Sequence, residues 1–242
     1  MRNPAWAKPK SFLDPSRRDW QFDVFAWLLR NSGGYPKFLD STLVLPTDEH
    51  FPDRGMSGHA AAAALFRRVR DHAGMADWPC AVEPDVNAGA TPSSFSDASH
   101  IPVIRYAPAL PPMAQAATFA HELARYLVET FEEPAPGGAP LFDPAVDVTA
   151  VFMGFGLFMA NSQFETASYD LNEGEMAHAL AIFCILRKLA PEAVDRHLNP
   201  HLRKYLRLAH RDLAQHGAKF QRLRSIFAVL PISERTLPTR AL

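Results

Sequence analysis

The sequence is poor in cysteine and has no hydrophobic run long enough to cross a membrane. Its 242 residues include two cysteines, Cys80 and Cys184, which lie more than a hundred positions apart. This spacing excludes a disulfide framework or a cysteine-based zinc ribbon, and it suits a reducing compartment. The longest apolar stretch, residues 148–160, has 13 residues, whereas a bilayer span needs about 20. We therefore expect a buried helix there and no membrane span.

The chain also lacks an excess of charge of either sign and an apolar leader at its start. Its formal net charge is -1, so nucleic acid is not expected as the main partner. The opening residues, MRNPAWAKPKSFLDPSRRDW, contain no apolar segment with a cleavage site of small residues. We therefore expect no signal peptide and a cytoplasmic location. No G-x-S-x-G sequence is present to suggest a serine nucleophile.

Hydrophobic periodicity and the 21 prolines divide the chain into helices and short strands. The expected strands are Phe38–Pro46, Cys80–Glu83 and Ile101–Tyr106, with a polar loop at 87–99. The expected helices are Ser16–Asn31, Ser57–Ala73, Met113–Glu132, Asp143–Phe164, Asn172–Leu189, a short one opening at Pro191, and His201–Gln215. The prediction is one α+β domain over residues 1–242, mainly α-helical. A small N-terminal sheet belongs to residues 1–110, and residues 111–242 are helical.

One segment has a spacing typical of metal chemistry: residues 118–128, TFAHELARYLV, inside an expected helix. Residues i and i+4 of a helix share a face, so two histidines at that spacing can bind one zinc ion. A glutamate directly after the first histidine can then act as general base on the zinc-bound water. His121 and Glu122 fit this pattern, but the i+4 position is Arg125. A guanidinium stays protonated and offers no lone pair to a metal.

The surroundings of this segment resemble a family of uncharacterised bacterial zincin-like proteins of the gluzincin type, whose helix carries a complete HExxH motif. The resemblance is carried by LVLPTDEHFP, RVRDHAGMADWP, IPVIRYAP, ATFAHELARYLVET, FDPAVDVTAVFMGFGLFMANS and YDLNEGEMAHALAIF. It implies a zincin-like core centred on the His121 helix. In a member that binds zinc, it implies hydrolysis of a peptide bond, with the metal polarising the carbonyl.

The resemblance also implies roles for individual residues. In gluzincins the third zinc ligand is a carboxylate from a later helix, and a second acid four residues on orients a ligand histidine. Asp143 and Asp147 match this spacing. His121 and Asp143 are thus the implied metal ligands, Asp147 orients His121, and Glu122 is the implied catalytic base. The chain departs from the family at Arg125 and at Asp143, where the longer glutamate is usual.

With these departures, zinc has two protein ligands instead of the three that catalytic zinc normally requires. His178, on the expected helix 172–189, is one candidate for a missing nitrogen ligand. His100, just before the expected strand Ile101–Tyr106, is another. We expect no cofactor in the leading interpretation, and zinc only if such a residue completes an unconventional site.

Arg125 itself suggests a different arrangement. Acidic residues gathered around a lost dication would repel one another, and a fork-shaped cation can relieve that repulsion. A contact from Arg125 to Asp143 or to Glu122 would give a metal-free pseudo-active site. The simplest alternative is that Arg125 points to solvent and pairs with Glu129, four residues later.

Three functions remain open on this basis. The leading hypothesis is a degenerate, zinc-metallopeptidase-like protein with impaired or no peptidase activity. It acts as a binding or regulatory protein for an unidentified protein or peptide partner through the inherited cleft. The first alternative is an active zinc peptidase with an unconventional third ligand. The second is an anion-binding module that uses a basic C-terminal helix. The basic residues concerned are Arg203, Lys204, Arg207, Arg211, Lys219, Arg222 and Arg224. Leucines interleave with them at helical spacing, which favours a solvated face of a docked helix.

Residues 153–156, MGFG, are not a phosphate loop, because no strand precedes them and no Lys-Ser/Thr follows. Each glycine costs about 1 kcal/mol inside a helix. We therefore expect Gly154 and Gly156 to allow a close approach to the His121 helix, within a central buried helix.

Overall fold

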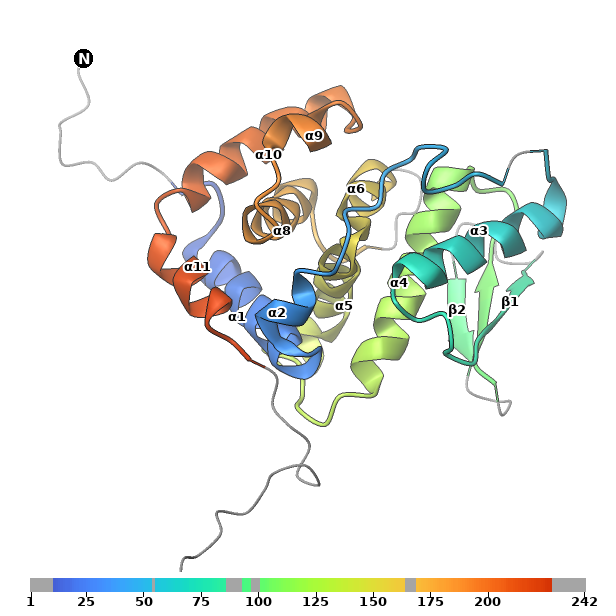
Figure 1. Cartoon of the computed structure of the whole chain (residues 1–242). Helices are drawn as coiled ribbons and strands as arrows, with labels where there is room; N and C mark the ends of the chain where they lie inside the picture. The colour runs from blue at the N-terminus through green and yellow to red at the C-terminus, as the bar shows by residue number, and fades with distance from the viewer. Residues whose placement is uncertain (1–10, 54, 86–92, 97–100, 164–168, 228–242) are drawn as a thin grey trace, which may run out of the picture.

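Helices make up most of the fold, and a three-stranded sheet lies at one end of it (Figure 1). The computed structural model describes residues 11–53, 55–85, 93–96, 101–163 and 169–227, with side chains left out for 93–96. The longer helices are α1 (Pro15–Asn31), α3 (Gly58–His72), α4 (Pro112–Glu129), α5 (Phe142–Ala150), α8 (Glu173–Leu186), α10 (Pro200–Leu213) and α11 (Gly217–Arg224). The shorter ones are α2 (Gly34–Phe38), α6 (Gly156–Asn161) and α9 (Pro191–Asp195). The expected mainly helical α+β class is confirmed.

The sheet has the order β1-β3-β2, with β1 (Ala81–Pro84) parallel to β3 (Val103–Tyr106) and β2 (Ser93–Ser96) antiparallel to it. In Figure 1, α4 lies between this sheet and the remaining helices, and α3 crosses in front of the sheet. The buried Tyr106 ring of β3 packs edge-on against Phe119 of α4, at a centroid distance of 5.5 Å. The sheet therefore supports the helix that carries His121.

The predicted strand Phe38–Pro46 is wrong. Helix α2 ends at Phe38, and the chain then runs on without a strand, with the Val44 N–H donating to the carbonyl of Gly154 at 3.0 Å. Leu43 and Val44 are buried because this segment crosses the central helix. Burial by a tertiary contact had produced an apolar pattern that resembles a strand. The third strand is instead β2, inside the expected loop.

Small residues let α4 pack closely on both sides. Ala116, Ala117, Ala120 and Ala124 are fully buried. Helices α3 and α5 both pack against α4. Alanine has a high helix propensity, and its short side chain lets the backbones of neighbouring helices approach α4 closely. His121 and Glu122 are therefore held in the middle of a layered helical packing.

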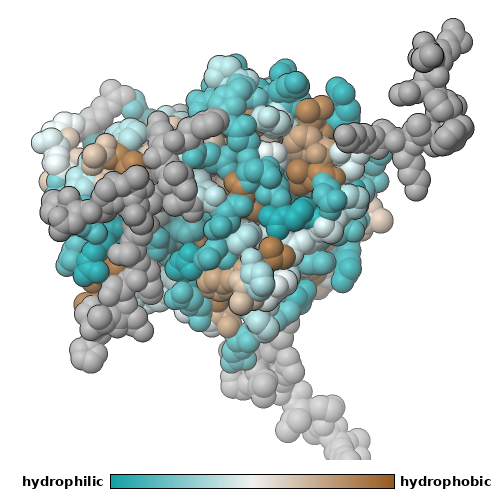
Figure 2. Space-filling model, turned by 180° about the vertical axis from the view of Figure 1, so that it is seen from behind, coloured by the Kyte–Doolittle hydropathy of each residue, from teal (hydrophilic) through white to brown (hydrophobic). Residues whose placement is uncertain are grey.

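Residues Ala139–Asn161 form one long apolar helical stretch, in which a π-helical turn (Val151–Phe155) joins α5 to α6. Its 23 residues have the length and composition of a membrane span, but 83% of its most apolar window is buried inside the protein. It is the core helix that the sequence predicts. On the face shown in Figure 2, the coloured hydrophobic residues form small patches separated by hydrophilic ones.

The two glycines of this stretch serve contacts other than the expected one with the His121 helix. Gly154 has φ +100°, and a Cβ there would lie 2.1 Å from the carbonyl oxygen of Thr42. A Cβ on Gly156 would lie 2.9 Å from Cδ1 of Leu180 on α8. Helix α4 does pack against this turn and against α6, but the space that a Cβ would fill at the two glycines belongs to other segments. Gly154 admits the chain segment after α2, and Gly156 admits α8.

Buried hydrophobic residues from both parts of the chain join in one core cluster, which runs from Trp20 on α1 to Leu223 on α11. Helix α8 begins with a capping box, in which Asn172 Oδ1 accepts from Glu175 N and Glu175 Oε2 accepts from Asn172 N. From Met176 to Cys184 every residue of α8 is buried. Helices from both parts of the chain therefore share one core.

Candidate functional site

His121 and Asp147 meet at the interface of α4 and α5. His121 Nδ1 lies 3.0 Å from Asp147 Oδ1. His121 is 7% exposed and Asp147 is fully buried. Both residues come from helices whose packing fixes their positions, α4 by its alanine surface and α5 as part of the core stretch. The structure thus gives Asp147 the contact predicted for a residue that orients His121.

The second oxygen of Asp147 holds the chain just before α8. Asp147 Oδ2 accepts hydrogen bonds from the backbone N–H groups of Asp170, at 2.8 Å, and Leu171, at 3.1 Å. Since both carboxylate oxygens act as acceptors, the neutral imidazole of His121 must carry its hydrogen on Nδ1. The lone pair of that ring is then on Nε2. Asp147 therefore selects the tautomer of His121 and ties three chain segments together.

The pKa of His121 is raised above its ordinary value by its neighbours. Burial on its own lowers this pKa, but the hydrogen bond and the charge of Asp147 outweigh it, with a further contribution from Glu122. The positive charge of Arg125 acts in the opposite direction. Asp170 is affected as well, since burial and the charges of Asp147 and Asp143 raise the pKa of its carboxyl group. The region thus has an excess of negative charge.

Arg125 contacts Asp143, as one of the sequence alternatives expects. Arg125 Nη2 donates to Asp143 Oδ1 at 2.7 Å, one turn along both helices from the His121–Asp147 pair. The Arg125 guanidinium also lies 5.7 Å from the centroid of the Phe142 ring. The side chain of Asp143 is 52% exposed and that of Arg125 is 25% exposed. Asp143 therefore opens α5 at the surface, where water screens its charge.

Glu122, the candidate base, is buried beside His121 with 5% of its surface exposed. Its charge contributes to the raised pKa of His121. It also acts on Cys80, next to β1, where burial is the main cause that raises the pKa of the thiol to about 11. Glu122 thus lies within electrostatic reach of both His121 and the sheet.

The residues of this site do not fit a zinc ion. Among the residues that the structure describes, no group of three or more His, Cys, Asp or Glu side chains is placed to hold a metal. Asp143, the implied third ligand, has its Oδ1 on the guanidinium of Arg125. His121 and Asp147 form a pair whose Oδ2 is already used by two backbone N–H groups. We therefore assign no catalytic step to a metal.

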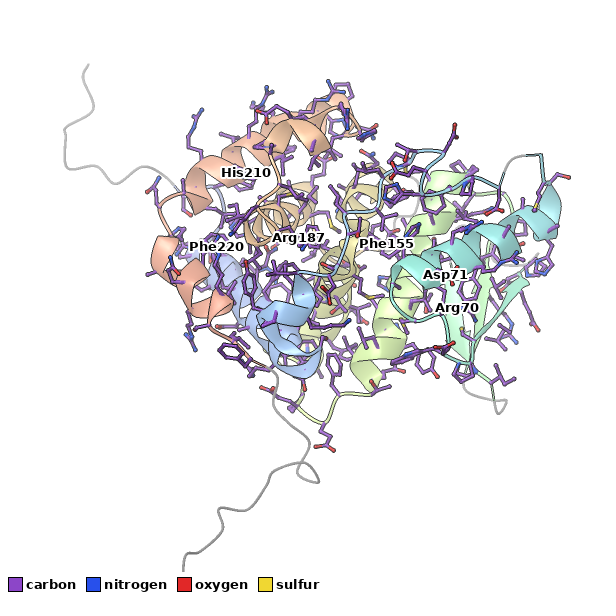
Figure 3. The ribbon with its side chains drawn as sticks, in the orientation of Figure 1. Arg70, Asp71, Phe155, Arg187, His210 and Phe220 are labelled. Carbon is purple, nitrogen blue, oxygen red and sulfur yellow. The ribbon has the colours of Figure 1, made fainter. Side chains whose placement is uncertain are left out.

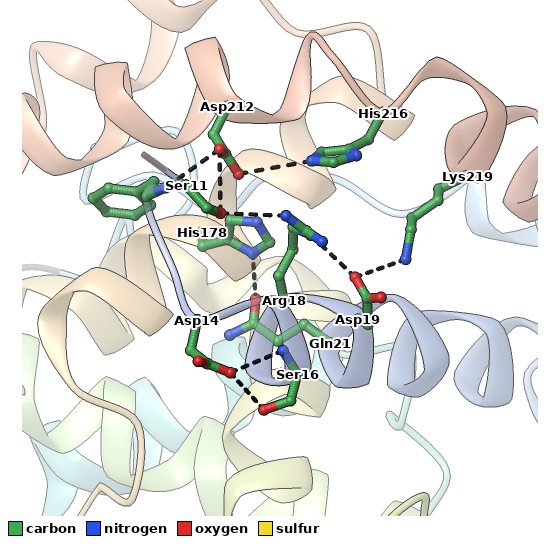
Figure 4. Close-up of polar contacts among 11 residues, drawn as sticks. Ser11, Asp14, Ser16, Arg18, Asp19, Gln21, His178, Asp212, His216 and Lys219 are labelled. Carbon is green, nitrogen blue, oxygen red and sulfur yellow. Dashed lines mark hydrogen bonds and ion pairs between the residues drawn. The ribbon is translucent and has the colours of Figure 1, made fainter. Parts of the chain in front are cut away.

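His178, the first candidate for a further ligand, belongs to a different contact. Its Nδ1 lies 2.7 Å from Oε1 of Gln21 on α1 (Figure 4). Gln21 Nε2 donates to the backbone carbonyl of Glu175 at 2.9 Å. This amide orientation makes His178 Nδ1 the donor. Burial lowers the pKa of His178 to about 4, so the ring is a neutral core residue. The hydrogen bond that the structure gives His178 is thus with α1 and not with the His121 site. His100, the second candidate, lies outside the described residues.

The basic C-terminal region forms the outer face of a docked helix. Leu202, Leu206, Ala209 and Leu213 of α10 are buried, whereas Lys204, Arg207 and Arg211 are exposed. Lys219 pairs with Asp19 at 2.7 Å, and Arg224 donates to the carbonyl of Ile185. Part of the positive charge therefore serves internal contacts, which agrees with the simpler interpretation of this region.

Sequence reasoning missed the segment that closes the site. Tyr169 packs against His121, with the two ring centroids 5.9 Å apart, and the next two residues donate their N–H groups to Asp147. The signal was available in part, because YDLN opens one of the stretches that carry the family resemblance. Its role as a backbone donor is independent of side-chain identity, so no residue type marks it.

Comparison of the chain with protein-family models, curated proteins and solved structures gives no match.

Proposed function

We propose that this protein is a degenerate, zinc-metallopeptidase-like protein with a zincin-like core, in which peptidase activity is impaired or absent. Its role is to bind a protein or peptide partner, or to regulate one, through the surface around Arg125 and Asp143. The observation that supports this most strongly is the 2.7 Å bond between Arg125 Nη2 and Asp143 Oδ1. In the resembling family these two positions supply metal ligands, and here they form an ion pair.

The contact between His121 and Asp147 supports a zincin-like origin of the site. A carboxylate on Nδ1 of a histidine is the usual partner of a metal-binding imidazole, because it fixes the tautomer that presents Nε2. The 3.0 Å pair at positions 121 and 147 has this form. Here the same pair also anchors the residues before α8, so it has a structural use that does not depend on metal.

Arg125 supports the loss of metal chemistry in two ways. Its guanidinium cannot ligate a cation. Its positive charge also opposes a dication next to it, while it partly balances Asp143 and the neighbouring acids. We include a cytoplasmic location in the proposal, supported by Cys80 and Cys184, which are both free.

The substitution Arg125→His tests this proposal. It supplies the second imidazole at i+4, removes the cation and releases Asp143, so the variant should gain zinc where the wild type has none. Elemental analysis after dialysis should give about one zinc per chain, with a higher melting temperature in zinc, because a ligand that binds the folded state stabilises it.

Two control variants separate this result from nonspecific binding. Arg125→Gln removes the cation without adding a ligand and should not gain zinc. Arg125→His combined with His121→Ala should lose the zinc again. If Arg125→His gains neither metal nor thermal stability while remaining folded, the zincin-derived interpretation fails. If the wild type binds zinc and His121→Ala abolishes it, an active peptidase with a further ligand replaces our proposal.

A further inference from the structure

A cavity of about 390 Å³ lies away from the His121 site, between the segment after α2, the end of α3 and the π-helical turn. Its apolar wall consists of Phe38, Leu127, Phe152 and Met153. The ring centroids of Phe38 and Phe152 lie 4.8 Å apart, and the two largely buried rings form the aromatic floor of the cavity. Binding cavities for small molecules have about 300–1,000 Å³ and combine such a wall with a few polar groups.

The ends of two long helices meet at this cavity. Ser32 caps the C-terminus of α1, which has 17 residues, and Ala73 caps that of α3, which has 15. Both capping residues line the cavity. The C-terminus of a helix carries a partial negative charge and has backbone carbonyls without helical partners. Two such ends at one cavity favour a positively charged group inside it.

The charged side chains at the cavity also favour a ligand with a positive charge. Asp71, on the last turn of α3, is exposed and lines the cavity (Figure 3). Asp40 and Lys37 also line it, and they pair with each other at 3.3 Å. The nearby Arg70 is engaged elsewhere, since its Nη1 donates to the carbonyl of Trp78. The charge of Asp71 also acts on Arg68, whose guanidinium pairs with Asp53 at 2.7 Å. Asp71 is therefore the acid of this cavity that is not held in an ion pair among the described residues.

Hydrogen-bond acceptors complete the polar side. The Oγ of Ser32 is buried and has no hydrogen-bond partner among the described residues. His72 Nε2 lies 3.1 Å from the carbonyl oxygen of His50, so this nitrogen must carry the hydrogen, and Nδ1 keeps its lone pair. The Ser32 Oγ is closed off from the cavity in this structure, so the acceptors offered to a ligand are Asp71 and the carbonyls of the two helix ends.

We propose that this cavity binds a small organic cation with an aromatic body, such as an arylalkylamine. The ammonium group contacts Asp71 and the helix ends, and the ring packs on Phe38 and Phe152. This inference rests on the cavity alone and is independent of the function proposed for the His121 site.

Titration of the full-length protein with 2-phenylethylammonium, followed by amide chemical shifts, tests the proposal. We expect saturable binding at about 1 mM or tighter. The shifts should map to residues 40–42 and 73–74, which line the cavity. The uncharged analogue 2-phenylethanol should bind about tenfold more weakly, and the anion 3-phenylpropionate should not saturate. Nα-acetyl-lysine amide, which has a free ε-ammonium but no ring, should also bind about tenfold more weakly, because the aromatic wall contributes to binding.

Asp71→Asn should weaken the amine about tenfold, because a hydrogen bond to a charged group is lost. Asp77→Asn is the matched control: it removes an exposed carboxylate shortly after α3 that does not line the cavity, and affinity should change less than about twofold. Equal binding of the alcohol and the amine would overturn the proposal. So would unchanged affinity in Asp71→Asn, shifts that map elsewhere, or no saturation at about 10 mM.

Discussion

Two aspartates on the same helix should differ greatly in their contribution to stability. Asp143 and Asp147 lie one turn apart on α5, and each accepts a hydrogen bond from a basic side chain of α4. Asp147 is fully buried, whereas the side chain of Asp143 is 52% exposed. Substitution of each by asparagine removes the same charge with almost no change in shape, so the pair is an internally matched comparison.

For Asp147→Asn we expect the free energy of unfolding to fall by about 2–4 kcal/mol. The carboxylate accepts three N–H groups, from His121 and from the backbone of Asp170 and Leu171. Hydrogen bonds to a charged group contribute about 1.5–3 kcal/mol each, against about 1 kcal/mol for neutral ones. The amide has one acceptor oxygen, and its NH₂ must face either the imidazole or the backbone donors. For Asp143→Asn we expect at most about 1 kcal/mol, as for other exposed ion pairs.

Urea unfolding at pH 7, followed by the fluorescence of the buried Trp20 and Trp27, measures both values. The slope of the unfolding free energy against urea concentration should be the same in the wild type and both variants. A shift in the midpoint then reports a change in stability. If Asp147→Asn lies within about 0.5 kcal/mol of the wild type, Asp147 does not hold the site together as described. A larger loss in Asp143→Asn than in Asp147→Asn would contradict the reasoning just as directly.

Two further predictions concern the core. Gly154→Ala should cost about 3–5 kcal/mol, because it adds the strain of φ +100° to a clash 2.1 Å from the Thr42 carbonyl. Gly138→Ala, with φ +66° and nothing within 4 Å, should cost about 1–2 kcal/mol in the same unfolding assay; similar losses at both positions would refute the clash. Burial lowers the pKa of His178 from 6.5 to about 4 in the folded protein. As the pH falls, His178 is therefore protonated in the unfolded state before it is protonated in the folded state. Stability from this group is therefore complete above pH 6.5 and declines by about 3 kcal/mol on approach to pH 4. His178→Asn, which keeps a donor for Gln21, should reduce this pH dependence, and an unchanged dependence would contradict the assignment.

Periodic segments of the sequence predicted most of the helices and the mainly helical α+β class. The stretch from Pro112 to Glu129 and the apolar stretch around Val148–Ala160 are helical as expected. Their patterns are long, and tertiary packing on their apolar faces reinforces the local preference. The sequence also predicted the contact between Asp147 and His121, because a spacing of four residues on α5 and the resemblance agreed.

The errors arose where tertiary contacts determine the structure. Leu43 and Val44 are apolar because their segment crosses Gly154, and not because they form a strand. Strand β2 consists of Ser93–Ser96, whose polar composition resembles a loop, and its pairing with β3 comes from the backbone. The exposure of Asp143 depends on how α5 begins after the turn at Gly138, which no local pattern reveals. The zincin-like core itself remains a prediction.

The zinc content of the wild-type protein tests the central claim most directly. After gentle purification and dialysis against excess zinc, elemental analysis should find no zinc retained by the chain. Arg125 forms an ion pair with Asp143 and cannot itself serve as a ligand. About one zinc per chain, lost in His121→Ala, would contradict this account. It would mean that a further ligand completes the site, and that zinc-dependent peptidase activity is the function to test.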